Sequence, residues 1–87
     1  MDFFSLEHLS KIVSGEIKGD PKKQIYNIEN FSVCNSSSIC FIKSKTDLKN
    51  LSPNAGAILT TSEISKKING ESSFLIVDDP YLGFAKL

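Results

Sequence analysis

The sequence predicts a small α/β domain, built on a mixed sheet of about five short strands with flanking short helices. Short, continuous apolar runs at residues 39–42, 55–61 and 74–77 are typical of strands buried on both faces. Segments with a helical spacing of apolar residues alternate with these runs, so part of the sheet is expected to be parallel. Gly, Pro and Asn residues separate the segments and mark the turns.

Length and composition limit the classes of protein to which the chain can belong. Its 87 residues have room for one domain, residues 1–87. Ten basic and ten acidic residues give a net charge of zero, which argues against nucleic acid or a membrane surface as the partner. No apolar run approaches the roughly 20 residues of a membrane-spanning helix. The early acid Asp2 argues against a signal peptide, so neither export nor membrane insertion is predicted, and the expected location is cytoplasmic.

Two cysteines and one histidine offer little for metal or redox chemistry. Cys34 and Cys40 fit neither a disulfide framework nor a zinc spacing, and they are predicted to be free thiols. His8 falls on the outward side of the first predicted helix, where a solvated surface role is favoured over catalysis. No metal site and no cofactor are predicted.

The first predicted helix starts at Ser5. Its hydroxyl can cap the free N–H groups, while Phe4 can pack on Leu9 as a hydrophobic staple. Leu6, Leu9, Ile12 and Val13 recur on one face, and Gly15 is expected to supply the left-handed residue that ends the helix.

The middle of the chain alternates strands and turns. Strands are predicted at 16–18 and 24–28, joined through a turn at 19–21, as a hairpin or a bent strand pair. Residues 31–33 have some strand character, and 39–42 is predicted to be a central strand. A short helix at most is expected at 48–51. Residues 62–68 are expected to form a helix capped by Ser62 and ended by Asn69 and Gly70.

The closing segment predicts a strand, a turn and a helix. Residues 74–77 form the strand, Asp79 is suited to cap a helix, and Pro80 is favoured at the first helical position. Capping also explains the adjacent Asp78 and Asp79 better than paired acid–base catalysis does. Since no helix-ending signal precedes Leu87, the chain is expected to be the first domain of a longer protein.

One segment suggests a ligand site. No Gly-rich phosphate loop and no Gly-x-Ser-x-Gly elbow occurs, so no catalytic residue is predicted. Phe41 at a strand end, followed by Lys43, Lys45 and Lys49, could hold a small anionic ligand with a flat base. The alternative is that Phe41 belongs to the core and the lysines to a solvated loop, and composition alone favours this alternative.

Five segments in register resemble a known family. They are residues 4–9, 15–20, 38–42, 55–59 and 77–87, the last of which reads Val-Asp-Asp-Pro-Tyr-Leu-Gly-Phe-Ala-Lys-Leu. In order and spacing they resemble the N-terminal, non-repeat domain of UDP-3-O-acylglucosamine N-acyltransferase, an enzyme of lipid A biosynthesis in Gram-negative bacteria. The likeness covers essentially the whole chain.

The resemblance implies a function for the domain. Enzymes of this family are cytoplasmic homotrimers that transfer a 3-hydroxyacyl chain from acyl carrier protein to the glucosamine nitrogen. Their first domain is a small α/β module that holds the uridine of a UDP-glucosamine-type substrate. A left-handed β-helix of hexapeptide repeats follows it and carries the catalytic histidine. That catalytic domain is absent from residues 1–87, so the chain alone is expected to be inactive.

The family's uridine motif, Phe-Leu-x-Asn-Pro-Lys-Tyr, matches this sequence in part. Phe41 occupies the position of the ring that stacks on uracil, and Lys43, Ser44 and Lys45 are candidate phosphate or uridine contacts. Ser44 stands at the Asn position and Asp47 at the position of the second, Tyr ring. These two substitutions leave open a packing module that has lost nucleotide binding. Residues 80–87 are also similar to the related first domain of the peptidoglycan amide ligases, which stays open as a further alternative.

Overall fold

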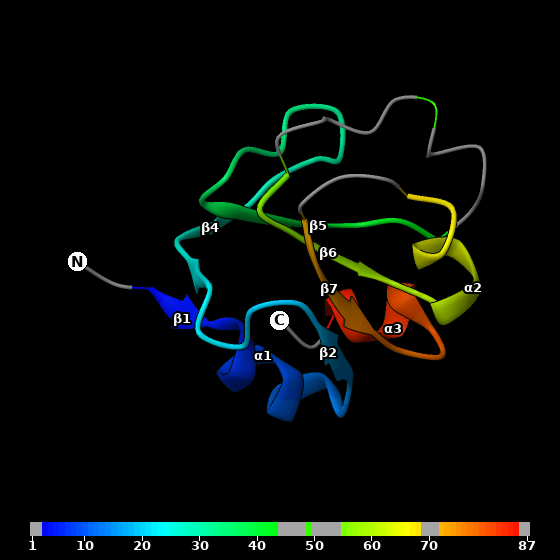
Figure 1. Ribbon diagram of the computed structural model, residues 1–87, viewed down its shortest axis with the longest axis horizontal. Helices are drawn as coiled ribbons and strands as arrows, with labels where there is room; N and C mark the ends of the chain where they lie inside the picture. The colour runs from blue at the N-terminus through cyan, green and yellow to red at the C-terminus, as the bar shows by residue number, and fades with distance from the viewer. Residues whose placement is uncertain (1–2, 44–48, 50–54, 69–71, 86–87) are drawn as a thin grey trace.

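The computed structural model describes residues 3–43, 49, 55–68 and 72–85 (Figure 1). The predicted helix at 48–51 lies outside the described residues, apart from Lys49. The elements are β1 (Phe4–Ser5), α1 (Leu6–Val13), β2 (Glu16–Lys18), β3 (Gln24–Ile25), β4 (Asn27–Ile28), β5 (Ser38–Phe41), β6 (Ala57–Thr60), α2 (Ser62–Ser65), β7 (Ser73–Ile76) and α3 (Pro80–Ala85).

A five-stranded mixed sheet in the order β2-β7-β6-β5-β4 is the centre of the fold. Strands β4, β5, β6 and β7 run parallel, and β2 joins the far edge antiparallel to β7. A separate two-stranded ladder pairs β1 with β3. The predicted fold class, a small mixed α/β sheet with short flanking helices, is therefore confirmed.

Each face of the sheet has its own core, because successive side chains of a strand point to opposite faces. The first core cluster joins the buried face of α1 to alternate strand residues: Leu6, Leu9, Val13, Ile25, Ile39, Ala57, Leu59 and Leu75. The second core cluster lies on the other face, with α2 and the loop before β5: Cys34, Cys40, Ile42, Ala55, Ile58 and Ile64. Helix α1 therefore covers the face of the first cluster, and Ile64 of α2 lies on the opposite face.

Helix α1 begins as predicted but ends differently. Ser5 caps it, with its Oγ accepting a hydrogen bond from the His8 N–H at 3.1 Å. The left-handed residue is Ser14, with φ of 56°, and not Gly15. Gly15 is needed for a different reason: a Cβ there would lie 2.9 Å from the Ile76 carbonyl oxygen. Ile12, predicted on the buried face, is 40% exposed, because α1 contacts the sheet through its other apolar residues.

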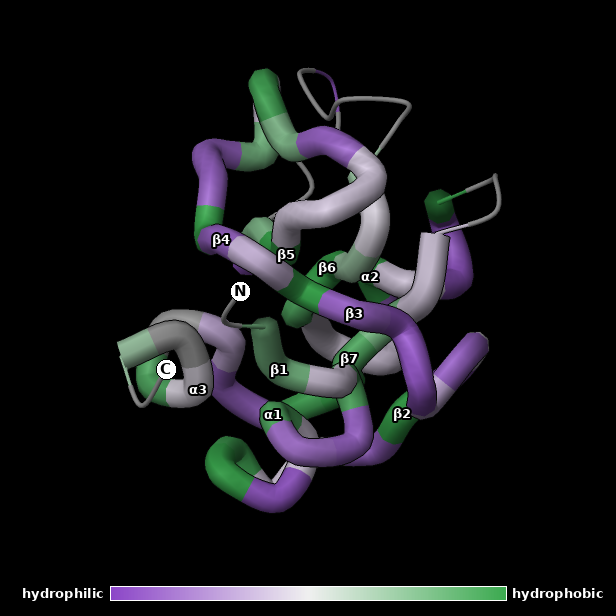
Figure 2. The backbone as a smooth tube through the Cα atoms, turned by 90° about the vertical axis from the view of Figure 1, so that its left-hand side faces the viewer, coloured by the Kyte–Doolittle hydropathy of each residue, from purple (hydrophilic) through white to green (hydrophobic). Residues whose placement is uncertain are grey.

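The predicted hairpin between residues 16–18 and 24–28 does not form. Instead β2 pairs with β7, and Tyr26 interrupts 24–28 so that β3 pairs with β1 and β4 with β5. Asp20 and Gly19 form the predicted turn, in which Gly19 has φ of 131° and lies against Ser73 of β7. Figure 2 shows this turn and β3 as a largely hydrophilic stretch that crosses in front of β7. Long-range pairing with β7 thus replaced the local hairpin.

Three further predictions concern the loops and β5. Residues 31–33 form turns and no strand. Strand β5 lies inside the sheet but next to the β4 edge, while β6 is the central strand. Helix α2 is capped by Thr61, whose Oγ1 accepts from the Ile64 N–H at 3.2 Å, and not by Ser62. The helix ends at Ser65, earlier than predicted.

The closing segment follows the prediction closely. In β7, Ser73 and Leu75 are buried, whereas Phe74 and Ile76 are half-buried. Asp79 Oδ1 accepts a hydrogen bond from the Leu82 N–H at 3.2 Å, so Asp79 does cap α3. None of the helices in the described part of the chain has the length and apolar character needed to cross a bilayer.

Candidate functional site

Phe41 ends β5, and neighbouring strands hold the backbone around it on both sides. On the β4 side, the Glu29 N–H donates to the Ile39 carbonyl at 3.1 Å, which carries the pairing past the end of β4. On the β6 side, the Ile42 N–H donates to Leu59 O at 3.0 Å, and the buried Thr60 hydroxyl donates to Ile42 O at 2.7 Å. The end of β5 is therefore fixed before any ligand arrives.

A hollow of about 360 Å³ lies where β4 and β5 end. Its lining is Ile28, Glu29, Asn30, Phe31 and Phe41. Because β4 and β5 are parallel, the hollow is at the carboxyl ends of two adjacent strands, the place where open α/β sheets usually bind ligands. Aromatic rings, an amide and a carboxylate around one hollow suit a small ligand that is flat and polar at its edge.

The turn after β4 is held in place by its own asparagine. Asn30 Oδ1 accepts hydrogen bonds from the Ser32 N–H at 3.0 Å and the Ser32 Oγ at 2.8 Å. The Val33 N–H donates to the Asn30 carbonyl at 3.0 Å. Phe31, at the tip of this turn, is half-buried and packs against the second core cluster. Side-chain capping of this kind gives the turn a defined shape.

Three of the five residues predicted for the site are described, and one of them, Lys49, is exposed and does not line the hollow. Phe41 is half-buried and lines the hollow, while Lys43 is exposed two residues further along the chain. Ser44 and Lys45, like Asp47, lie outside the described residues. Sequence reasoning missed Phe31 and Asn30. Their signal was an Asn-x-Ser turn directly after a strand that runs parallel to β5.

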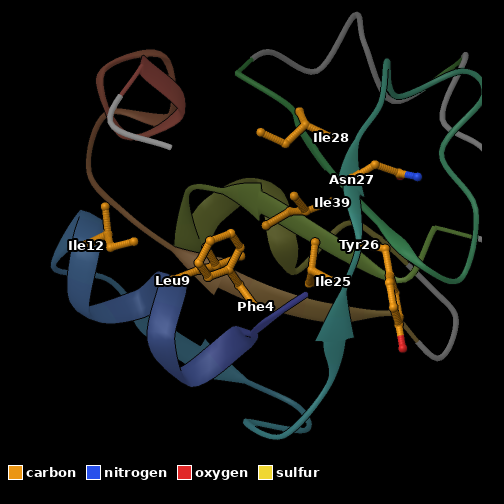
Figure 3. A pocket seen from close by; sticks show the side chains of 8 residues that line it. All are labelled: Phe4, Leu9, Ile12, Ile25, Tyr26, Asn27, Ile28 and Ile39. Carbon is orange, nitrogen blue, oxygen red and sulfur yellow. The ribbon is translucent and has the colours of Figure 1, made fainter. Parts of the chain in front are cut away.

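A second hollow, of about 260 Å³, lies between α1 and the β3–β4 segment (Figure 3). Aliphatic side chains and the Phe4 ring fill its wall, and in Figure 3 the side chains of Tyr26 and Asn27 point away from it. Asn27 Oδ1 accepts a hydrogen bond from the Ser38 hydroxyl. Since a ligand site needs polar groups that orient its ligand, the hollow beside Phe41 is the better candidate.

Other reactive side chains do not form a site within the described residues. His8 is exposed and stacks on Phe4, with ring centroids 5.2 Å apart. Cys34 and Cys40 are both free and buried. The hydrogen bond that Cys40 shares with Cys34, together with its burial, raises the pKa of the Cys40 thiol far above its usual value. No group of three or more His, Cys, Asp or Glu side chains in the described part could hold a metal ion.

Comparison with known proteins shows that this sequence is similar to part of one group of enzymes. UDP-3-O-acylglucosamine N-acyltransferase of Cytophaga hutchinsonii is 31% identical over 85 residues, which cover 97% of this chain and 24% of that protein. The enzyme of the same name from Acinetobacter baylyi is 28% identical over the same share of both chains. UDP-3-O-acylglucosamine N-acyltransferase 2 of Francisella tularensis subsp. holarctica is 32% identical, and the chain covers 25% of it.

The resemblance predicted from the sequence motifs is confirmed by these relatives. Nearly the whole chain is similar to part of these acyltransferases, and it spans about a quarter of their length. No family model matches the chain.

Proposed function

Because nearly the whole chain is similar to part of the UDP-3-O-acylglucosamine N-acyltransferases, we propose that it is their N-terminal, UDP-sugar-binding domain. In this role it holds the uridine of a UDP-3-O-acylglucosamine substrate. Acyl transfer from acyl carrier protein then belongs to the remainder of a full-length homotrimeric enzyme, in a hexapeptide-repeat domain. The chain by itself is a binding domain without catalytic residues.

One observation carries the proposal: Phe41, the residue that matches the family's stacking ring, lines a hollow at the carboxyl ends of β4 and β5. A phenyl ring stacks on any base, and each such contact contributes about 1–3 kcal/mol in single-stranded nucleic-acid complexes. The hydrogen bonds around Ile39 and Ile42 fix the backbone on each side of Phe41. Little ordering free energy is therefore lost when a base binds against the ring.

The diphosphate can bind outside the hollow, beside the exposed Lys43. It follows Phe41 by two residues, so its ammonium can act as a point charge toward phosphate while the base lies inside. Ser44 and Lys45 are proposed as further contacts on sequence grounds alone.

Calorimetric titration of the chain with UDP tests the proposal. We expect UDP and UDP-N-acetylglucosamine to bind with similar affinity, because uridine is their shared part. Phe41→Leu should weaken both equally, by roughly 5- to 150-fold if one stacking face is lost. If the wild-type chain binds no UDP at millimolar concentration, the alternative of a packing module without nucleotide binding takes its place.

A further inference from the structure

The candidate hollow has two phenyl rings, and they come from different elements. Phe41 packs against the first core cluster, on one face of the sheet, and Phe31 packs against the second, on the other. Both rings are half-buried and both line the hollow beyond the ends of β4 and β5. Aromatic rings approaching from opposite faces of the sheet can accept a flat ligand between them.

This sequence lacks the second stacking ring of the family motif. In the family motif the second stacking ring is a tyrosine, but its position here holds Asp47, whose side chain has no aromatic face. A stacking partner on that side of the base must come from another segment. Among the side chains that line the hollow, Phe31 is the one aromatic residue besides Phe41.

Asn30 adds a hydrogen-bond donor with a defined orientation. A backbone N–H can only donate, so the Asn30 atom that faces the Ser32 N–H at 3.0 Å must be the amide oxygen. Asn30 lines the hollow, and its Nδ2 group is the donor that it can offer to a ligand there. Uracil has a carbonyl oxygen at position 4, which accepts such a bond, whereas cytosine has an amino group there, which donates.

Glu29 complements this donor. Glu29 lines the hollow and its carboxylate can only accept, while uracil carries an N–H at position 3 where cytosine carries a lone pair. The same negative charge disfavours a diphosphate nearby, so the base binds inward and the phosphates point away from Glu29.

We propose that the turn of residues 29–31 replaces the missing part of the family's uridine motif in this chain. Phe31 stacks on the face of uracil opposite Phe41, and Asn30 and Glu29 read its polar edge. This inference rests on the proposed uridine site and assigns its second ring and its base specificity. The hydrogen bonds of Asn30 order the turn in advance, so the ring and the donor are placed without a cost at binding.

Variants of the turn test the stacking role by calorimetric titration of the 87-residue chain with UDP. Phe31→Leu keeps the apolar contact with the second core cluster but removes the ring, and we expect Kd to rise by roughly 5- to 150-fold. Val33→Ala is the matched control, because Val33 lies in the same turn and is 61% exposed without lining the hollow. Its Kd should stay within about twofold of wild type, as is usual for surface substitutions.

Asn30→Asp tests the specificity role and does not depend on the stability of the Phe31 variant. Asp keeps the oxygen that orders the turn but replaces the donor, so the preference for UDP over CDP should fall by at least about fivefold. UDP and CDP carry the same diphosphate, so the negative charge that Asn30→Asp adds weakens both equally. The ratio of their Kd values therefore reports only on recognition of the base.

The outcomes separate the two proposals. If Phe41→Leu weakens UDP binding while Phe31→Leu stays within twofold and Asn30→Asp keeps the UDP/CDP ratio, the turn plays no part and only the inference fails. If the wild-type chain does not bind UDP at all, the proposed function fails and the inference with it.

Discussion

Replacing Thr60 with valine tests how firmly the end of β5 is held. Thr60 is fully buried and its Oγ1 donates to the Ile42 carbonyl at 2.7 Å, next to Phe41. Valine has nearly the same shape, but its methyl group cannot donate, so the buried carbonyl loses this partner. Leaving a buried acceptor unsatisfied costs about 1–3 kcal/mol. A methyl carbon is also too large for a contact of 2.7 Å, so the strand end must shift.

Thermal unfolding followed by circular dichroism measures this cost. For a domain of this size about 1 kcal/mol lowers Tm by roughly 4–8 °C, so Thr60→Val should lower it by at least about 4 °C. Ser10→Ala is the matched control, because the Ser10 hydroxyl also donates to a backbone carbonyl, Glu7 O at 2.7 Å, but at an exposed site where water can replace it. Its Tm should change by less than about 3 °C. If Thr60→Val unfolds at the wild-type temperature, the Thr60 bond does not secure the strand end.

Three further predictions concern caps and thiols. In urea titration, Thr61→Ala should lower the unfolding free energy by about 1 kcal/mol, because the helix loses its cap. Ser62→Ala should change it by less than about 0.5 kcal/mol. Equal losses in the two variants would contradict the Thr61 cap. Ser14→Gly should stabilise the chain by about 1 kcal/mol, since glycine adopts the φ of 56° without strain, and a lower Tm would contradict this. The raised pKa of Cys40 means that, above the usual thiol pKa of about 8.5, the unfolded chain loses a proton that the folded chain keeps. The hydrogen bond from Cys40 lowers the pKa of Cys34, which opposes this trend below the unfolded thiol pKa. Unfolding free energy should therefore fall as pH rises from about 9 to 11. Cys40→Ala should flatten that fall, and an unchanged slope would contradict the assignment.

The parallel strands were predictable because continuous apolar runs indicate strands that are buried in a sheet. Residues 39–42, 55–61 and 74–77 each became an interior strand, and Asp79 and Pro80 started the last helix as their chemistry requires. Local signals sufficed wherever the neighbouring residues alone decide the conformation.

Pairing between distant segments could not be read in the same way. The strand at 16–18 has a partner 56 to 60 residues away in β7, and nothing in its own sequence distinguishes this from a local hairpin. Ser14 adopts the left-handed conformation that was expected of Gly15. A Cβ at Gly15 would lie 2.9 Å from Ile76 O, so this glycine serves packing instead of the cap.

Only the β5 side of the candidate site could be predicted from the sequence, for a related reason. Phe41 was found from its place at a strand end and from the family motif. Phe31 became a candidate only once β4 was known to run parallel to β5, because that pairing brings the turn after β4 beside Phe41. Residues 31–33, interpreted from composition as strand-like, are instead the turn that completes the hollow.

Chemical-shift mapping of the isotope-labelled chain during titration with UDP tests the central claim most directly. The amide signals of residues 29–31 and 41–43 should move together and saturate with one Kd, while those of α1 and β3 stay in place. Millimolar UDP that moves none of these signals, or that moves those of α1 and β3 instead, would contradict a uridine site at the ends of β4 and β5.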